Sequence, residues 1–192
     1  MPRLAPELNA VIGELHAAAR RLRTLHSTLP CDAWSRRPRA TRWSPAECVA
    51  HLNLTSEALI PLLHTGLQQA SEDPCRALSP YRRDLVGWLV WKVMTPSGGL
   101  RTRAVSAFIP SVETPCETLV ADFERLQADV ISLVRAADGL PIDHVKLVSP
   151  FDPRLRYNLY AALTLVPRHQ HRHLLQAERA GVRAPAASAI AV

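Results

Sequence analysis

Residues 159–180 have the sequence LYAALTLVPRHQHRHLLQAERA, in which apolar side chains recur every three or four positions. This spacing predicts an amphipathic helix. Its inward stripe comprises Leu159, Ala162, Leu163, Val166, His169, His173 and Ala177. Pro167 interrupts the pattern, and an interior proline removes one helical hydrogen bond and clashes with the preceding turn, so either a kink or the start of a new helix is expected there.

Helical periodicity continues toward the N-terminus. Apolar residues from Leu8 to Leu29 predict a long helix that Pro30 ends. Ser44-Pro45-Ala46-Glu47 forms a capping box with proline at the first helical position, and it opens a second helix that is expected to end near Gly66. Residues 31–43 and 71–80 between the periodic segments are expected to be loops.

Two further helices complete the pattern. Tyr81 to Met94 predicts a shorter helix. Thr114-Pro115-Cys116-Glu117 repeats the capping arrangement and opens a helix that Gly139 and Pro141 close. The stretch from Thr95 to Val112 has no clear pattern, and no segment stands out as a strand. Together these segments predict an all-α four-helix bundle with one extra short helix.

The chain has 192 residues, enough for one domain with a sizeable core, which we place at residues 1–180. Residues 181–192 are small and repetitive and are expected to form a disordered tail. The start of the chain lacks the apolar core of a signal peptide, and no apolar run is long enough to span a bilayer, so we expect a cytoplasmic protein without a membrane partner. The four cysteines have no C-x-x-C spacing, and in a cytosolic chain they are expected to be reduced, with Cys48 in the core.

The formal net charge is +6, but the basic residues are spread along the chain. The densest basic patch, residues 36–42, fits a solvated loop, and no helix-turn-helix, zinc-finger or RNP pattern accompanies it. We therefore expect no nucleic-acid partner. Trp88 and Trp91 on the short helix either form an exposed face, through which the chain would form a homodimer, or pack in the core.

Histidines supply the chemistry that the sequence suggests. His169 and His173 are four residues apart, so they lie one turn apart on one helix face, the spacing by which a helix presents two imidazoles to one metal ion. Both continue the apolar stripe and point into the bundle, whereas His171 points away. His51, on the same face as Cys48 and Leu52, is the best candidate for a third ligand from another helix.

Roles without a metal ion also fit these histidines. An inward histidine is more often a satisfied core residue than a ligand, and an H-x-x-x-H pair arises easily by chance among eight histidines. A histidine-rich run is also compatible with a solvated basic face.

Two motifs resemble those of the DinB superfamily, bacterial four-helix-bundle proteins with a three-histidine metal site. Residues 43–52, WSPAECVAHL, are similar to the family's W-S-x-x-E-x-x-x-H-L, and residues 169–176, HQHRHLLQ, are similar to its H-x-x-R-H-L-x-Q. Asp152-Pro153 resembles the family's D-P before the last helix. The resemblance implies that His51, His169 and His173 bind a divalent metal ion, with zinc or nickel the family expectation and iron or manganese as alternatives.

The resemblance also implies candidate functions. Three histidines without a fourth protein ligand describe an open site of the catalytic kind. Relatives include thiol-dependent S-transferases and metal-dependent hydrolases, so we expect a small-molecule substrate and, for a transferase, a low-molecular-weight thiol. The alternative is a non-catalytic metal-binding or stress-response protein with a structural metal site, in which Cys48 would supply the fourth ligand. Glu47 is best explained as a capping residue, and no general base is identifiable.

Overall fold

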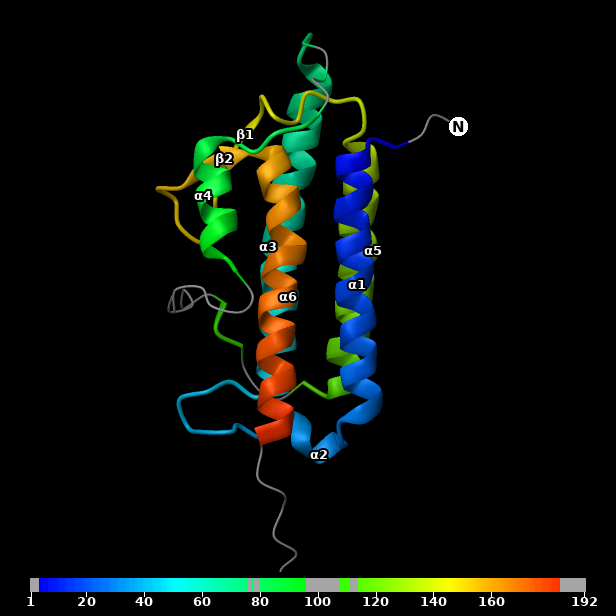
Figure 1. Ribbon diagram of the computed structural model, residues 1–192, viewed down its shortest axis with the longest axis vertical. Helices are drawn as coiled ribbons and strands as arrows, with labels where there is room; N and C mark the ends of the chain where they lie inside the picture. The colour runs from blue at the N-terminus through cyan, green and yellow to red at the C-terminus, as the bar shows by residue number, and fades with distance from the viewer. Residues whose placement is uncertain (1–3, 76, 78–79, 96–107, 111–113, 184–192) are drawn as a thin grey trace, which may run out of the picture.

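Four long helices form the body of the protein in the computed structural model, which describes residues 4–75, 77, 80–95, 108–110 and 114–183 (Figure 1). They are α1 (Pro6–Thr28), α3 (Pro45–Glu72), α5 (Cys116–Ala136) and α6 (Leu159–Arg183). Helix α3 packs against α5 and α6, and α1 packs against the same two helices. Two shorter helices accompany them, α2 (Cys31–Trp34) and α4 (Leu85–Val93). The predicted all-α four-helix bundle is therefore confirmed.

The helices are joined with one long crossover. Helices α3 and α5 both start at the end of the bundle where α2 lies, as the colour gradient in Figure 1 shows. The chain must therefore return along the whole bundle between Glu72 and Cys116, and α4 lies on this return path beside α6. Long crossovers of this kind are an established variant of the four-helix bundle.

Two apolar clusters fill the bundle. The larger contains side chains from α1, α3, α5 and α6 together with Ile142 and Leu147, which follow α5. The second lies toward α2 and contains Trp34, Cys48, Phe123 and Leu174. Burial of apolar surface against its neighbours holds each long helix, since isolated helices of this length have little stability in water. Among the described residues, no helix combines the length and the apolar character that a membrane span requires.

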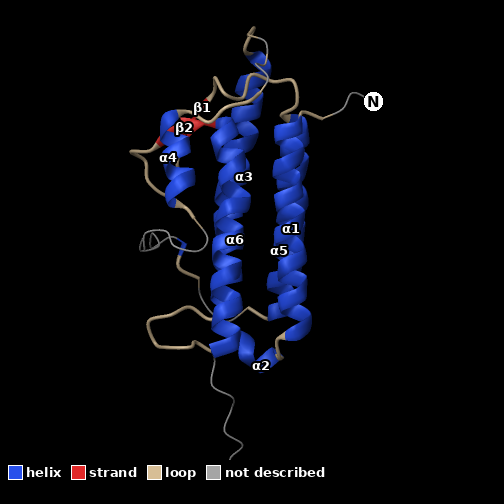
Figure 2. Cartoon of the chain, in the orientation of Figure 1, coloured by secondary structure: helices blue, strands red, loops and turns tan. Residues whose placement is uncertain are grey.

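A small hairpin was not expected from the sequence. Strands β1 (Lys146–Val148) and β2 (Arg156–Asn158) pair antiparallel, with Leu147 opposite Tyr157 (Figure 2). Each strand is three residues long, which is too short for an alternating pattern to be visible in the sequence. Asp152, at the turn between them, accepts a hydrogen bond from the Arg154 amide. The hairpin delivers the chain directly into α6.

The capping box at the start of α3 is confirmed. The Ser44 hydroxyl accepts a hydrogen bond from the Glu47 amide, and the Glu47 carboxylate accepts one from the Ser44 amide. The similar motif at the start of α5 does not cap in this way, because Pro115 occupies the N-cap and no side chain caps the helix. The expectation for Thr114 was therefore wrong.

One unexpected short helix and two helix boundaries also differ from the prediction. Residues 31–34 form the short helix α2, where a loop was expected, because Trp34 is 2% exposed and needs a defined backbone to reach the core. Helix α3 continues past Gly66 to Glu72, since Gly66 faces the Leu147 and Leu159 side chains and serves close packing. Helix α4 starts at Leu85, with Asp84 as its N-cap, and Tyr81 is buried in the core ahead of it.

Helix α6 runs without a break from Leu159 to Arg183 and contains Pro167. The alternative that a new helix starts at Pro167 is therefore wrong. The helix also extends past Gly181, where the tail was expected to begin, while residues 184–192 lie outside the described part of the chain. Most of the unpatterned stretch from Thr95 to Val112 lies outside it as well.

Helix α4 is held on α6 by cation–π contacts and close packing. The guanidinium carbons of Arg168 and Arg83 lie 3.6 and 4.4 Å from the centre of a Trp91 ring, and Arg168 Nε donates a hydrogen bond to the Trp91 carbonyl. Trp91 therefore packs against the bundle, whereas Trp88 is 44% exposed. Trp91 therefore matches the alternative of packing against the core, and Trp88 matches the alternative of an exposed face.

The close approach of α4 to α6 depends on Gly87. A Cβ atom at this position would overlap the Ala161 side chain and lie 2.7 Å from Asp84 Oδ1. We expect Gly87→Ala to lower the free energy of unfolding by about 1–3 kcal/mol, because the two helices would have to separate. Gly13→Ala is the matched control, since a Cβ there meets nothing within 4 Å and should raise stability by about 0.5–1 kcal/mol. Urea unfolding of both variants measures the two effects, and equal stability of the variants would contradict this role of Gly87.

Candidate metal centre

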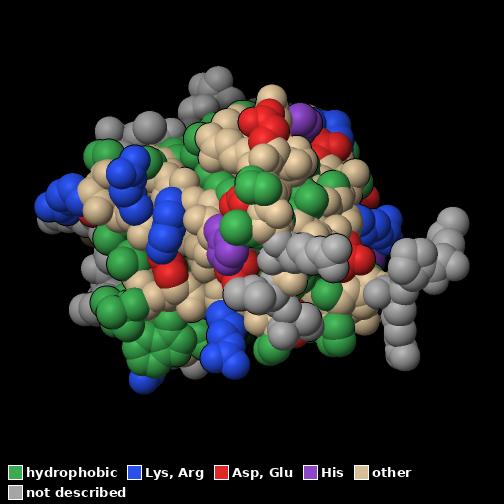
Figure 3. Space-filling view, turned by 90° about the horizontal axis from the view of Figure 1, so that it is seen from above, with side chains coloured by type: hydrophobic (Ala, Val, Ile, Leu, Met, Phe, Trp, Pro, Cys, Tyr) green, Lys and Arg blue, Asp and Glu red, His purple; other side chains and the backbone are tan. Residues whose placement is uncertain are grey.

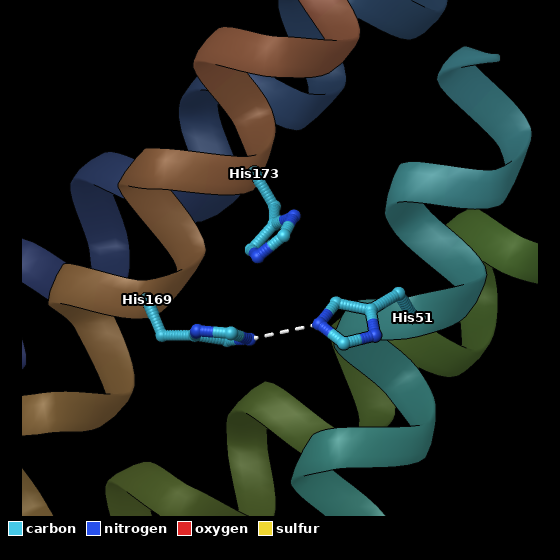
Figure 4. A group of neighbouring side chains, drawn as sticks. All are labelled: His51, His169 and His173. Carbon is cyan, nitrogen blue, oxygen red and sulfur yellow. Dashed lines mark hydrogen bonds between the residues drawn. The ribbon is translucent and has the colours of Figure 1, made fainter. Parts of the chain in front are cut away.

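The structure brings His51, His169 and His173 together, as the sequence predicted (Figure 4). His51 lies in the second turn of α3, and the other two lie one turn apart on α6. The ligand atoms that they offer all lie within 4.8 Å of one another. Since α3 and α6 pack along their length, the two histidine-bearing faces are held opposite each other by the bundle itself.

A hydrogen bond from its Nδ1 atom fixes the orientation of the His51 ring. His51 Nδ1 donates a hydrogen bond to the Phe108 carbonyl at 2.8 Å, because a carbonyl oxygen only accepts. Neutral His51 therefore has an unprotonated Nε2 that faces α6. This arrangement, in which one ring nitrogen is held by a backbone carbonyl and the other is free, is typical of metal-binding histidines.

The nitrogen separation fits one shared ion. His51 Nε2 and His169 Nε2 are 3.2 Å apart, with His169 donating when no metal is present. Two imidazole nitrogens on one tetrahedral zinc ion would be about 3.3 Å apart, given Zn–N bonds of about 2.0–2.1 Å. His173 Nδ1 is buried and finds no hydrogen-bond partner among the described residues. The donor set and the nitrogen spacing together suit a divalent ion.

Desolvation favours the neutral form of all three imidazoles, of which His51 is buried and His169 and His173 are half-buried. Desolvation lowers the pKa of His51, although its hydrogen bond to Phe108 opposes the shift. Desolvation, assisted by the His51 and Arg172 charges, lowers the pKa of His169 to about 3. The pKa of His173 is well below its ordinary value, because of burial first and then the neighbouring His169 and His51. Neutral imidazole is the form that binds metal ions.

The rotation of α6 is set by polar contacts of the residues between the two ligands. Gln170, 2% exposed, points into the core, where it exchanges hydrogen bonds of 2.7 and 3.0 Å with Gln127 on α5. His171 faces α1, where its Nε2 lies 3.1 Å from a Glu14 carboxylate oxygen and its Nδ1 lies 3.1 Å from Arg21 Nη1. His171 therefore stays outside the group, as its position on the helix predicted.

Aromatic side chains surround the three histidines, and the sequence did not identify them. The Trp43 ring lies 4.9 Å from the His51 ring and 5.9 Å from the His173 ring, and the Phe151 ring lies 6.1 Å from the His169 ring. Phe108 contacts Phe151 at 4.9 Å. Trp43 stands in the first sequence motif, but Phe108 and Phe151 lie outside the helices, where no periodicity points to them.

The surroundings of Glu47 and Cys48, which precede His51 on α3, indicate structural roles for both residues. Glu47 is 1% exposed, accepts the Ser44 amide, and is bound by the Arg37 guanidinium, whose Nε donates at 2.8 Å. Its role as a capping residue is therefore confirmed. Cys48 is fully buried in the apolar cluster near α2, burial raises the pKa of its thiol, and it is not part of the three-histidine group.

A comparison with protein families agrees with this geometry. A model described as the DinB superfamily matches residues 14–177, which include all three histidines. The chain belongs to the DinB superfamily. The resemblance of the two sequence motifs to this family is thereby confirmed. No curated protein and no solved structure matched the chain in the corresponding searches.

The surface of this DinB superfamily protein bears on the partners expected from the sequence. On the face that Figure 3 shows, Lys and Arg side chains lie among acidic and apolar ones. Arg36 and Arg37, in the densest basic stretch, pair with Asp32 and Glu47. The absence of a nucleic-acid partner stays a prediction.

The depressed histidine pKa values predict how stability depends on pH in metal-free protein. The unfolded chain protonates its histidines near pH 6.5, whereas folded His169 resists protonation down to a pKa of about 3. Because the unfolded state binds more protons in this window, the free energy of unfolding should fall as the pH falls from about 6.5 toward 3.

His169→Gln tests this dependence. The slope of the free energy of unfolding against pH, measured by urea denaturation between about pH 7 and 5 after chelation, should be shallower by up to about 1.4 kcal/mol per pH unit than in wild type. His64→Gln, at an exposed position of α3, is the control and should keep the wild-type slope. Equal slopes for wild type and His169→Gln would contradict the burial argument.

Proposed function

We propose that this DinB superfamily protein is a metal-dependent enzyme that acts on a small molecule, with a divalent ion held by His51, His169 and His173. The observation that carries the proposal is the convergence of three neutral imidazoles from two helices, with one nitrogen pair 3.2 Å apart. Zinc or nickel suits this all-nitrogen set, and iron or manganese are alternatives.

The group has the ligand number of a catalytic site. Catalytic zinc sites use three protein ligands and leave one position for water or substrate, whereas structural sites usually close with four. Neither Cys48 nor a carboxylate belongs to the group among the described residues. An ion bound here would lower the pKa of a coordinated water or thiol and so generate a nucleophile near pH 7.

Between the two reaction types, thiol transfer is better supported than hydrolysis. Hydrolysis by a bound water usually needs a general base within hydrogen-bond reach, and the three-histidine group includes no carboxylate among the residues that the structure describes. The nearby Arg172 charge, which lowers the pKa values of His169 and His173, favours an anionic ligand such as a thiolate at the same place. We therefore place S-transfer from a low-molecular-weight thiol first and hydrolysis second.

The side chains around the histidines suggest what the second substrate looks like. Trp43, Phe108 and Phe151 give the surroundings an aromatic character. Aromatic faces bury apolar and planar groups without competing for the metal. An apolar or conjugated electrophile therefore fits this environment better than a sugar or another strongly polar substrate.

The structural alternative is a protein in which the ion only joins α3 to α6. That interpretation needed Cys48 as fourth ligand, and the burial of Cys48 among apolar side chains does not support it. The alternative that remains is a non-catalytic site in which three histidines hold the ion and water takes the fourth position. Activity measurements distinguish this site from an enzyme.

Metal content tests the ligand set directly. Untagged wild-type protein, analysed by mass spectrometry, should carry divalent metal, and His51→Ala, His169→Ala and His173→Ala should each lower its affinity for zinc by at least about 100-fold. His64→Ala is the control, because this histidine is exposed on α3 and lies outside the three-histidine group. A folded wild type that takes up no zinc, nickel, manganese or iron would contradict the site.

Activity separates enzyme from structural protein. Metal-loaded wild type should accelerate the reaction of a small thiol with an aromatic electrophile such as 1-chloro-2,4-dinitrobenzene, or the hydrolysis of an aryl ester. His51→Ala should reduce the rate by at least about 100-fold, while His64→Ala, at an exposed position of α3, keeps it. A protein that binds metal through the three histidines but accelerates neither reaction across a panel of thiols, electrophiles and esters would favour the structural alternative.

A further inference from the structure

A second cluster of potential metal ligands lies at the end of the bundle where α2 is found. It includes His26 in the last turn of α1, and Cys116 and Glu117 at the start of α5. The ligand atoms that these three residues offer lie within 4.8 Å of one another. None of them belongs to the three-histidine group, and the sequence motif that contains Cys116 and Glu117 pointed to helix capping and not to metal binding.

A fourth donor stands beside this cluster. Cys31, the first residue of α2, has its Sγ 3.8 Å from Cys116 Sγ. Two thiolates on one tetrahedral zinc ion would be about 3.8 Å apart, given Zn–S bonds of about 2.3 Å. A disulfide would hold the same atoms at about 2.05 Å, so both sulfurs are free here.

The chemistry of the four side chains is that of a structural zinc site. Two sulfurs and one imidazole match the soft and borderline donors that zinc selects, and a carboxylate completes four ligands. Burial, with Glu117 and Cys31 nearby, raises the pKa of Cys116 to about 11, so the uncoordinated thiol keeps its proton at pH 7. Metal binding would displace one proton from each thiol to solvent.

The arrangement also suits the position of the cluster. Three segments meet there, namely the end of α1, the start of α2 and the start of α5, and Pro115 at the N-cap of α5 leaves that helix without a side-chain cap. Cys31 is exposed and lies at the start of a four-residue helix, so its side chain can turn toward an ion without disturbing the core. A bound ion would fix the three segments to one another.

We propose that Cys31, Cys116, His26 and Glu117 form a second, thiolate-containing site for zinc, independent of the three-histidine centre and structural in character.

Cobalt(II) distinguishes the two sites by spectroscopy. A cysteine-ligated Co²⁺ ion gives a sulfur-to-metal charge-transfer band in the near ultraviolet, which a three-histidine centre lacks because it has no sulfur. The titration uses the full chain, reduced and free of oxygen, as wild type and as His51→Ala. We expect the band in both proteins, with loss of the second cobalt equivalent only in His51→Ala.

Cysteine variants assign the band. Cys31→Ser, at an exposed position, should weaken zinc binding at this site by at least about 10-fold and roughly halve the band, because one thiolate remains, and Cys116→Ser should do the same if circular dichroism shows that it folds. Cys75→Ser is the control, because exposed Cys75 lies in a separate group with Asp73 and His144. The band should persist in this variant.

Three results would overturn the proposal. One is the absence of a charge-transfer band in reduced wild type, and another is a band that keeps its full intensity in Cys31→Ser or disappears in Cys75→Ser. The third is ready oxidation of reduced protein to a Cys31–Cys116 disulfide that added zinc does not slow, which would identify the two sulfurs as a redox pair.

Discussion

The contact between His51 on α3 and His169 on α6 brings two imidazole nitrogens to 3.2 Å where the two helices pack against each other. Removing such groups from water is unfavourable unless each nitrogen finds a partner. The structure provides one for His51 Nδ1, which donates to the Phe108 carbonyl, but none among the described residues for His173 Nδ1. This arrangement therefore lowers the stability of the metal-free protein. An ion that binds only the folded chain would raise the stability of the folded state again.

Helix α6 reaches this geometry because its neighbours determine its rotation. Gln170 binds Gln127 in the core, and His171 contacts Glu14 and Arg21 on α1, so the intervening face with His169 and His173 is left toward α3. Contacts also hold the helix on both sides of Pro167. Arg83 donates to the Thr164 hydroxyl before it, and Arg168 donates to the Trp91 carbonyl after it. These contacts explain how a helix can continue through a proline that removes one of its own hydrogen bonds.

The fold and the histidine group could be predicted because both depend on regular spacing. The 3.6-residue period carries information over many turns, and it placed His169 and His173 on one face and His171 on another. The helix boundaries that were predicted wrongly depend on tertiary contacts instead. Gly66 looks like a helix end until Leu147 and Leu159 are seen to pack against it, and the hairpin strands are too short to show a period. Phe108 and Phe151 approach the histidines through loops, and the pair Cys31 and Cys116 is 85 residues apart in the chain.

The two proposed sites act on different parts of the bundle. The three histidines connect α3 to α6, whereas the cysteine-containing cluster connects α1, α2 and α5. The long crossover separates α3 from α5 by more than forty residues, so no short loop holds these parallel helices together at the end where both begin. Ligands from the second turn of α3 and the first turn of α5 would therefore hold in place the ends of these two helices. An ion held by the three histidines would then have a fixed framework to bind to, with Trp43 and Phe151 beside it.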